Sequence, residues 1–381
     1  MKAAQKEWLK GVFVAIVSVA VMLGILEIGV RIFAPQPLVA TDLFLQTGQT
    51  PGATPSGATP DMQSRTARRG LSPDVVCRQT SSEFNVAVRI NSKGLRDAQR
   101  PYRKPRGVTR ILLLGDSFTF GYGVEERERF ANVVQQKLNA GARRYEVINA
   151  GVPSWGTADQ LLFLREEGLK YQPDIVAVCF YENDVHDNLE RDLFVVRNGE
   201  LVATTRQKQQ TAPRAGTITR DPFNDKILDI SREQSAPATQ SAPRTSRLIA
   251  HSHLARMVRL ALFSRKAAEI PASVERRKTA QILTAKLFDE INRECAKAGA
   301  TFKLILIPDK SYFARSKKST LWKFPILEKW KSQQPHRVLD LLPPLAKTAP
   351  PQSLYFPKDA HLNTRGNVVA AAAMEDFLAK P

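Results

Sequence analysis

Four short polar segments, far apart in the sequence, carry the side-chain types that acyl transfer requires. They are Gly115–Gly123, Asn149–Ser154, Tyr181–Asp184 and Asp359–Asn363. The chemistry needs a hydroxyl that attacks, a base that takes its proton, a carboxylate that orients the base, and donors for the oxyanion. Ser117, His361 and Asp359 are candidates for the first three roles, and the Asn183 amide is a candidate donor.

Each of these residues, taken alone, also has a structural interpretation. A serine between a strand and a helix is a common helix N-cap, and by itself Ser117 favours that interpretation. Asn183 and Asp184 are ordinary turn residues. Asp116, beside Ser117, is better explained as a structural hydrogen-bond partner than as a second catalyst. His361 has fewer structural explanations, so it is the combination of the segments that indicates catalysis.

The other histidines and the cysteines do not complete a metal site. We interpret His186 as a residue at the rim of the site and His336 as structural, while no nearby Cys or Glu completes a site at His251 and His253. The chain has three cysteines, Cys77, Cys179 and Cys295. They form no C-x-x-C pair, which argues against zinc and allows one disulfide at most. We therefore expect neither a metal nor a cofactor.

The elements that must position these residues can be predicted from the apolar pattern. Five apolar runs are predicted strands, at 111–115, 145–151, 174–181, 302–308 and 336–342, and stretches such as 129–139, 157–168 and 276–297 have helical spacing. Apolar strands separated by helices predict an α/β fold with a parallel sheet covered on both faces. Such a sheet places its site beyond the carboxyl ends of its strands. Three polar segments directly follow predicted strands, and the fourth precedes a final helix predicted near Thr364.

The order of these segments resembles that of the GDSL/SGNH hydrolase superfamily, whose four blocks all occur in sequence from about residue 91 onward. The resemblance implies a three-layer α/β/α flavodoxin-like fold. It implies that Ser117 is the nucleophile, that His361 is the general base and later the general acid, and that Asp359 orients the histidine. Three donors are implied for the oxyanion hole, namely the N–H groups of Ser117 and Ser154 and the side-chain amide of Asn183.

The chain departs from the family pattern in three places. Ser154 stands where the second block has Gly, which restricts a positive φ but keeps the backbone N–H. Tyr181 replaces the Gly of the third block and changes the pocket beside Asn183. The aspartate of the last block lies two residues before the histidine rather than three, and position 358 is Lys. This spacing resembles that of membrane-anchored bacterial branches linked to O-acylation of envelope polysaccharides.

An uncharged apolar stretch near the N-terminus predicts a membrane helix. It runs from Gly11 to Leu26, and on to Val30 if Glu27 lies at the interface; about 20 helical residues span roughly 30 Å of hydrocarbon. Lysines at positions 2, 6 and 10 predict a single pass through a bacterial inner membrane, with a cytoplasmic N-terminus and a periplasmic domain. A cleaved signal peptide is the alternative, although the nearest passable cleavage site lies well beyond the stretch, at Ala40.

The composition predicts three parts: a cytoplasmic N-terminus and anchor at 1–33, a flexible linker at 34–75, and an SGNH hydrolase-like domain at 76–381. The linker is indicated by the proline-rich stretch Thr47–Gly70, in which Gly-Ala-Thr-Pro occurs twice. A second biased stretch, with Ser-Ala-Pro at Ser235 and again at Ser241, predicts a surface insertion at about 190–250. A plain long loop is the alternative there.

The charge balance favours an anionic neighbour. The 381 residues carry a formal net charge of +19, which suggests nucleic acid, an anionic membrane surface or an acidic polymer. Twelve Lys and Arg residues stand against three carboxylates between Arg65 and Arg110. A domain outside the cytoplasm with no groove-reading motif fits nucleic acid poorly. We therefore interpret this stretch as a solvated face or as a holder of an anionic lipid or acidic glycan at the mouth of the site, with Arg96 as a candidate to reach it.

Three classes of function are compatible with the sequence. The first, which we predict, is a serine-dependent ester hydrolase or O-acyltransferase acting on acylated, for example acetylated, envelope carbohydrate, with partners in the polysaccharide-modifying machinery. The second is a non-catalytic glycan-binding or assembly protein that retains the fold, for which Ser154 and Tyr181 are the motivating departures. The third is a lipid-directed esterase, which closeness to the bilayer favours.

Overall fold

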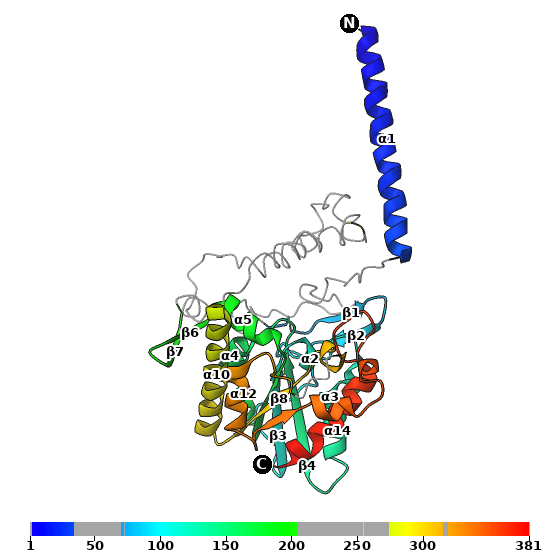
Figure 1. The fold of residues 1–381 in the computed structure, drawn as a ribbon. Coiled ribbons are helices and arrows are strands. Elements are labelled where there is room, and N and C mark those ends of the chain that lie inside the picture. The colour runs from blue at the N-terminus through cyan, green and yellow to red at the C-terminus, as the bar shows by residue number, and fades with distance from the viewer. Residues whose placement is uncertain are drawn as a thin grey trace, which may run out of the picture.

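The computed structural model describes residues 2–33, 70–71, 73–204, 254, 274–314 and 319–380. Its centre is a five-stranded parallel sheet in the order β4-β3-β5-β8-β9. The strands are β3 (Val108–Gly115), β4 (Arg144–Gly151), β5 (Ile175–Phe180), β8 (Thr301–Leu306) and β9 (Val338–Asp340). Numbered within the sheet this is the flavodoxin-like order 2-1-3-4-5. The predicted α/β class and all five predicted strands are confirmed (Figure 1).

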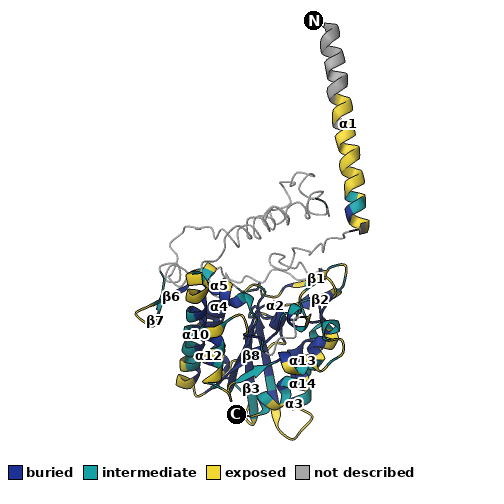
Figure 2. Ribbon diagram, in the orientation of Figure 1, coloured by how far each residue is buried: buried dark blue, intermediate teal, exposed yellow. Residues whose placement is uncertain are grey.

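Alternate side chains of the strands enter two separate cores. Leu112 and Leu114 of β3 pack into one cluster, whereas Ile111 and Leu113 pack into the other. This is the two-residue period of a strand that is buried on both faces. Figure 2 shows the sheet as the most deeply buried layer of the domain, with exposed residues on the outer sides of the helices.

Helices cover both faces of the sheet. One face packs against α4 (Thr157–Glu166), α10 (Val274–Lys297) and α12 (Pro325–Ser332), and the other against α3 (Phe130–Leu138), α13 (Leu342–Ala346) and α14 (Thr364–Ala379). The three-layer prediction is therefore confirmed. Shorter helices are α2 (Ser117–Phe120), α5 (Asn183–Arg191) and α11 (Ser311–Ala314), with 3₁₀ turns η4 (Glu126–Glu128), η5 (Gly168–Tyr171) and η6 (Pro351–Leu354). Most of these short elements lie at the ends of strands, where they shape the loops.

Two antiparallel hairpins lie outside the central sheet, and the sequence pattern predicted neither. The first joins β1 (Val76–Thr80) to β2 (Asn85–Arg89), and the second joins β6 (Phe194–Arg197) to β7 (Glu200–Ala203). Their strands are only four or five residues long. Such short runs give little periodic signal in a sequence.

The hairpins correct two of the predicted boundaries. Leu71 and Val75, placed in the linker by the sequence, are 0% and 1% exposed and belong to the core. The folded domain therefore begins before Val76. At the other boundary, Leu193 and Phe194 are also buried in the core, so 190–204 is part of the fold and not of an insertion. Residues 205–250 of the predicted insertion, and 34–69 of the predicted linker, lie outside the described residues.

The N-terminal helix α1 (Lys2–Phe33) contains the predicted apolar span. Within it, Phe13–Ile32 has a mean hydropathy of 2.5, and its large apolar side chains are exposed, as with Phe13 and Ile25 at 67% and 65% (Figure 2). The helix is long and apolar enough to cross a membrane, as a signal sequence also is. Among the described residues it is the single helix that meets this criterion.

Candidate active site

The polar segments meet at the carboxyl edge of the sheet, around β3. Ser117 follows β3, Ser154 follows β4 and Asn183 follows β5. The neighbours β4 and β5 pair with opposite sides of β3, and the connections through α3 and α4 cover opposite faces. The chain therefore reverses its direction across the sheet at β3, and open α/β sheets bind ligands at such a switch point.

Ser117 is held in a tight turn between β3 and α2. The preceding Asp116 caps the helix, because its carboxylate accepts a hydrogen bond from the Phe118 N–H at 2.9 Å. Helix α2 also lies directly against the end of β4, and a Cβ at Gly151 would come within 2.2 Å of the Phe120 nitrogen. The serine interpreted as a possible cap is therefore the first residue of the helix, and its neighbour performs the capping.

His361 joins Ser117 to Asp359 through both nitrogens of its ring. Its Nε2 lies 2.7 Å from Ser117 Oγ, and its Nδ1 lies 2.5 Å from Asp359 Oδ1. The same carboxylate oxygen accepts the His361 backbone N–H at 2.8 Å. Two residues separated by 244 positions in the chain thus come into hydrogen-bond contact. The arrangement has the connectivity of a nucleophile, a base and a carboxylate that orients the base.

The loop that carries Asp359 and His361 is fixed at both ends. Before α14 it folds back on itself, with the Phe356 N–H donating to the His361 carbonyl at 3.0 Å. After it, the Asn363 side chain caps α14 by accepting from the Gly366 N–H at 3.0 Å. Burial alone would raise the pKa of Asp359, but the hydrogen bonds and charge of His361 outweigh it and lower this pKa. Asp359 is therefore held as a carboxylate.

Aromatic rings surround the imidazole. Tyr122 stacks on the His361 ring with centroids 4.5 Å apart and planes at 27°, and Phe118 contacts the ring at 4.7 Å. Tyr181, which occupies the glycine position of the family pattern, packs on Phe118 at 4.4 Å. Its hydroxyl donates to Asp309 at 2.7 Å. The Tyr181 departure thus places a fixed ring against Phe118 and ties the end of β5 to the segment after β8.

The residues predicted to donate to an oxyanion stand at the ends of three neighbouring strands. The backbone N–H groups of Ser117 and Ser154 donate to no described residue. Ser154 has φ at +66°, so serine adopts the left-handed conformation that glycine takes more easily. Arg191 holds this residue by donating to the Ser154 carbonyl. The Asn183 amide nitrogen donates to Asp187 Oδ2 at 2.9 Å, which leaves its second N–H for another acceptor.

Two buried carboxyl groups, those of Asp116 and Asp184, belong to the sequence neighbours of the donors Ser117 and Asn183. Asp184 accepts hydrogen bonds from Thr157 and Gln160 of α4, at 2.9 and 3.1 Å. Burial, and then the charges of Asp116 and Asp187, raise the pKa of Asp184 well above its ordinary value. Burial also raises the pKa of Asp116 to about 6, although the Phe118 N–H and His361 oppose the shift. These groups link the loops of the site to one another and are structural.

A stability prediction follows for Asp116. A buried carboxyl whose pKa rises from 3.8 to about 6 on folding is most stabilising while protonated, below pH 3.8, and that contribution is lost as the pH rises through 6. The free energy of unfolding should therefore fall by roughly 2–3 kcal/mol between about pH 4 and pH 8 because of this group. Thermal unfolding across this range should show that Asp116→Asn weakens the pH dependence of stability, to which Asp184 and Asp187, whose pKa values burial also raises, still contribute. Asp376→Asn, an exposed control, should keep it, and an unchanged pH dependence in Asp116→Asn would contradict the argument.

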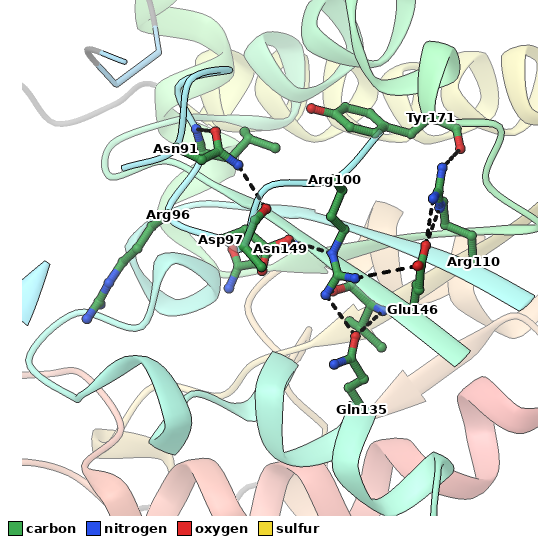
Figure 3. A network of polar contacts seen from close by, with 12 residues as sticks. Asn91, Arg96, Asp97, Arg100, Arg110, Gln135, Glu146, Asn149 and Tyr171 are labelled. Atoms are coloured by element: carbon green, nitrogen blue, oxygen red, sulfur yellow. Dashed lines mark hydrogen bonds and ion pairs between the residues drawn. The ribbon is translucent and has the colours of Figure 1, made fainter. Parts of the chain in front are cut away.

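The part of the basic stretch from Arg100 to Arg110 lies elsewhere than predicted. Figure 3 shows Arg100 and Arg110 pointing toward Glu146, and Arg110 contacts that carboxylate at 2.6 Å. Arg110 also donates to the Tyr171 carbonyl at 2.7 Å, and Lys104 pairs with Asp174. These contacts surround the beginnings of β3, β4 and β5, at the edge of the sheet opposite to Ser117. Arg100, Lys104 and Arg110 therefore form internal ion pairs away from the mouth of the site, whereas Arg78, Arg89, Arg103 and Arg106 are exposed, as a solvated face would be.

The remaining predicted residues do not enter the site chemistry. His186 is exposed near Asp187 and Glu190, and His336 lies exposed in the turn before β9. His251 and His253 lie outside the described residues. No group of three metal-binding side chains occurs in the described part of the chain. Of the chain's three cysteines, Cys179 and Cys295 are free and buried, and Cys77 is partly buried.

Comparison with known families decides the identity of the fold. The model of the GDSL-like lipase/acylhydrolase family matches residues 113–323. The chain belongs to this family. The matched residues include Ser117, Ser154 and Asn183, whereas Asp359 and His361 lie after the match. The predicted superfamily is thereby confirmed, and the chain is an ester-hydrolysing enzyme of the GDSL/SGNH type.

Several solved structures resemble this GDSL-family chain at low identity. A lipase/acylhydrolase from Enterococcus faecalis is 16% identical, with a TM-score of 0.37, over 71% of this chain and 95% of that one. A psychrotrophic esterase from Pseudoalteromonas sp. is 13% identical, with a TM-score of 0.35, over 71% and 97%. An acetyl xylan esterase is 14% identical, with a TM-score of 0.37, over 70% and 98%. No curated protein sequence matches the chain significantly.

Proposed function

We propose that Ser117, His361 and Asp359 carry out ester cleavage by acyl transfer through the serine. The hydrogen-bond chain from Ser117 Oγ through the imidazole to Asp359, at 2.7 and 2.5 Å, supports this proposal. His361 Nε2 takes the hydroxyl proton as Oγ attacks the ester carbonyl carbon, and the resulting imidazolium is stabilised by Asp359. The tetrahedral intermediate collapses, and the leaving alkoxide takes the proton from the imidazolium. The product is an acyl-serine.

The second half of the reaction restores the enzyme. A water molecule or an acceptor hydroxyl loses its proton to His361 Nε2 and attacks the acyl carbon, and Ser117 Oγ leaves with that proton. Water gives hydrolysis, and an alcohol gives transfer of the acyl group. Rates of product formation with and without a sugar acceptor distinguish these outcomes. Acyl-sugar formation at the expense of free acid would identify an O-acyltransferase.

The oxyanion would be held by the backbone N–H groups of Ser117 and Ser154 and by the Asn183 amide. One such donor typically contributes about 10²–10³ in kcat. We therefore expect Asn183→Ala to lower kcat by that factor, because the remaining two donors keep part of the stabilisation. Steady-state kinetics on a short acyl ester measures the change. Asn139→Ala, at the far end of α3, is the matched control; a loss below tenfold in Asn183→Ala would show that the oxyanion is held elsewhere.

For the substrate, we propose an acylated carbohydrate. A hollow of about 450 Å³ opens beside Asp359. Six of its nine lining residues have polar or charged side chains, namely Asp309, Lys310, Ser311, Gln352, Lys358 and Asp359; the other three are Ala314, Pro357 and Ala360. Ammonium, hydroxyl and amide groups suit a hydroxyl-bearing substrate, whereas sites for alkyl chains are mainly apolar.

The substrate proposal is tested by comparing acetylated sugars with long-chain fatty acyl esters. Release of acetate at a higher kcat/KM than release of fatty acid would support a carbohydrate substrate. The reverse order would indicate the lipid-directed esterase. If no ester is cleaved and a fluorophosphonate probe fails to label the purified protein, the non-catalytic glycan-binding alternative is the better one.

We also propose that α1 anchors the enzyme in a bacterial inner membrane, with the catalytic domain in the periplasm. The apolar Phe13–Ile32 span and the lysines before it support this topology. A reporter fused after Pro381 should be active in the periplasm, and the domain should be digested by protease in spheroplasts. Reporter activity in the cytoplasm would overturn this topology. Recovery of a soluble protein that lacks α1 would instead indicate a cleaved signal sequence.

A further inference from the structure

A part of the fold that precedes the family match contacts both halves of the site. It comprises the β1–β2 hairpin and the segment that follows it, up to Arg96; we call residues 76–96 the N-terminal bracket. The family match begins at residue 113, so the bracket is an addition to the matched region. In Figure 1 the hairpin lies next to α2, the helix that begins with Ser117.

Arg96 attaches the bracket to the loop after α2. Its side chain is 0% exposed and donates to the Gly121 carbonyl at 2.6 Å and to the Val124 carbonyl at 2.8 Å. It also donates to Phe120 and, within the bracket, to Ala87, at 3.2 and 3.1 Å. The sequence interpretation of Arg96 as a residue that reaches the site is therefore wrong, because backbone carbonyls engage its guanidinium. The arginine instead fixes the loop that carries Tyr122.

Phe84, at the turn of the hairpin, continues this connection to the histidine. Its ring meets Tyr122 edge to face, with centroids 5.5 Å apart and planes at 83°, and Tyr122 stacks on His361. Gly123 lets the rings approach, because a Cβ there would lie 2.8 Å from both Phe84 and Phe356. The Gly123 N–H also donates to Gln79 of β1 at 2.9 Å.

The same turn contacts the loop that carries the catalytic pair. Phe84 packs on Phe356 at 5.1 Å, and Glu83 accepts the backbone N–H of Lys358 at 2.9 Å. Lys358 directly precedes Asp359. One turn of two adjacent residues therefore touches the loop after Ser117 on one side and the loop before His361 on the other. These loops come from opposite ends of the domain sequence.

We propose that the N-terminal bracket sets the position of the His361 ring relative to Ser117, with Phe84 and Tyr122 as positioning residues. The proposal rests on the proposed function of Ser117 and His361. Proton transfer requires the imidazole nitrogen to keep its contact with the hydroxyl, and a displacement of about 1 Å can lower a rate on the order of 10²-fold. The His361 ring stacks on Tyr122, and its backbone is fixed in the loop before α14. Its Nε2 therefore keeps the contact with the Ser117 hydroxyl.

The test compares variants at the two positioning residues with a short acyl ester as substrate. Tyr122→Leu should lower kcat by roughly 10- to 100-fold and Phe84→Leu by about 10-fold, with KM changed less than threefold. Tyr122→Phe and Phe84→Tyr keep a ring in place and should restore most of kcat. Phe377→Leu, the same change at a half-buried ring near the end of α14, should leave kcat unchanged.

A double variant distinguishes positioning from general weakening of the fold. If Phe84 acts through Tyr122, the double Leu variant should lose no more activity than Tyr122→Leu alone, because coupled residues are not additive. Additive losses, or losses confined to KM, would overturn the proposal. So would an unchanged kcat in Tyr122→Leu, which can be interpreted even if Phe84→Leu fails to fold. A wild-type enzyme with no esterase activity would instead refute the proposed function.

Discussion

Replacing Ser117 by alanine should lower kcat for ester cleavage by about 10³-fold or more while the domain stays folded. In the proposed mechanism this hydroxyl forms the acyl intermediate, and it hydrogen-bonds to His361 at 2.7 Å. No other described hydroxyl contacts this imidazole nitrogen, so the variant has no substitute nucleophile among the described residues. His361→Ala should lower kcat by a similar factor, because a serine hydroxyl without a base is a weak nucleophile at neutral pH.

The measurement combines kinetics with covalent labelling. A fluorophosphonate probe should label the wild-type enzyme at Ser117 and should not label Ser117→Ala, whereas Ser332→Ala, at the end of α12, should label like the wild type. Residues that act as one unit lose activity non-additively. The Ser117→Ala, His361→Ala double variant should therefore be no slower than either single variant. Equal labelling of the wild type and Ser117→Ala would exclude Ser117 as the nucleophile.

The second large effect concerns Asp359. Asparagine keeps the size of the side chain but removes the charge that stabilises the imidazolium and favours an Nδ1–H tautomer of His361. We expect Asp359→Asn to lower kcat by about 10³–10⁴-fold with little change in KM. The lowered pKa of Asp359 also predicts that its carboxylate is retained well into acidic solution.

The control for this variant is the exposed Asp376→Asn on α14, which should have wild-type kinetics. Circular dichroism and thermal unfolding establish that Asp359→Asn remains folded. A loss smaller than about tenfold would show that another group orients the histidine. The Asp–x–His spacing would then be a loop feature without a catalytic role.

The sheet and the meeting of the polar segments were predictable from sequence because both depend on strong periodic signals. β5 is apolar throughout, and β3 and β8 end in the apolar runs 111–114 and 304–306, as strands buried on both faces do. The residues that follow them are then fixed at one edge by topology alone. For the same reason Ser117 and Asn183 could be placed near each other without any knowledge of their contacts.

The N-terminal bracket could not be predicted in this way. Its strands have only five residues each, so their alternation of buried and exposed positions is too short to give a periodic signal. Its attachment depends on Arg96 donating to carbonyls 24 to 28 positions away. The sequence alone does not show whether water or a buried carbonyl accepts the hydrogen bonds of a charged side chain. The same ambiguity led the sequence analysis to treat Arg100 and Lys104 as a binding face.

The backbone of Ser154 shows a third limit of prediction from the sequence. The family pattern indicated that serine stands at a glycine position, and serine there was expected to restrict a positive φ. The chain nevertheless adopts φ of +66°, with Arg191 donating to the carbonyl of that residue and pairing with Asp159 at 3.5 Å. The tertiary contact outweighs a local preference of about 1–2 kcal/mol, and such contacts are not visible in a local sequence pattern.

The long interval between Ser117 and His361 also has a consequence during synthesis. Ribosomes make the chain from its N-terminus, so the serine emerges 244 residues before the histidine. A nascent chain that ends within that interval contains Ser117 but not His361, so it has no base to activate the serine and no esterase activity by the proposed mechanism. In the proposed mechanism, hydrolytic activity therefore arises only when the segment before α14 has been made and packs against the loop after β3, which ties the onset of activity to completion of the fold.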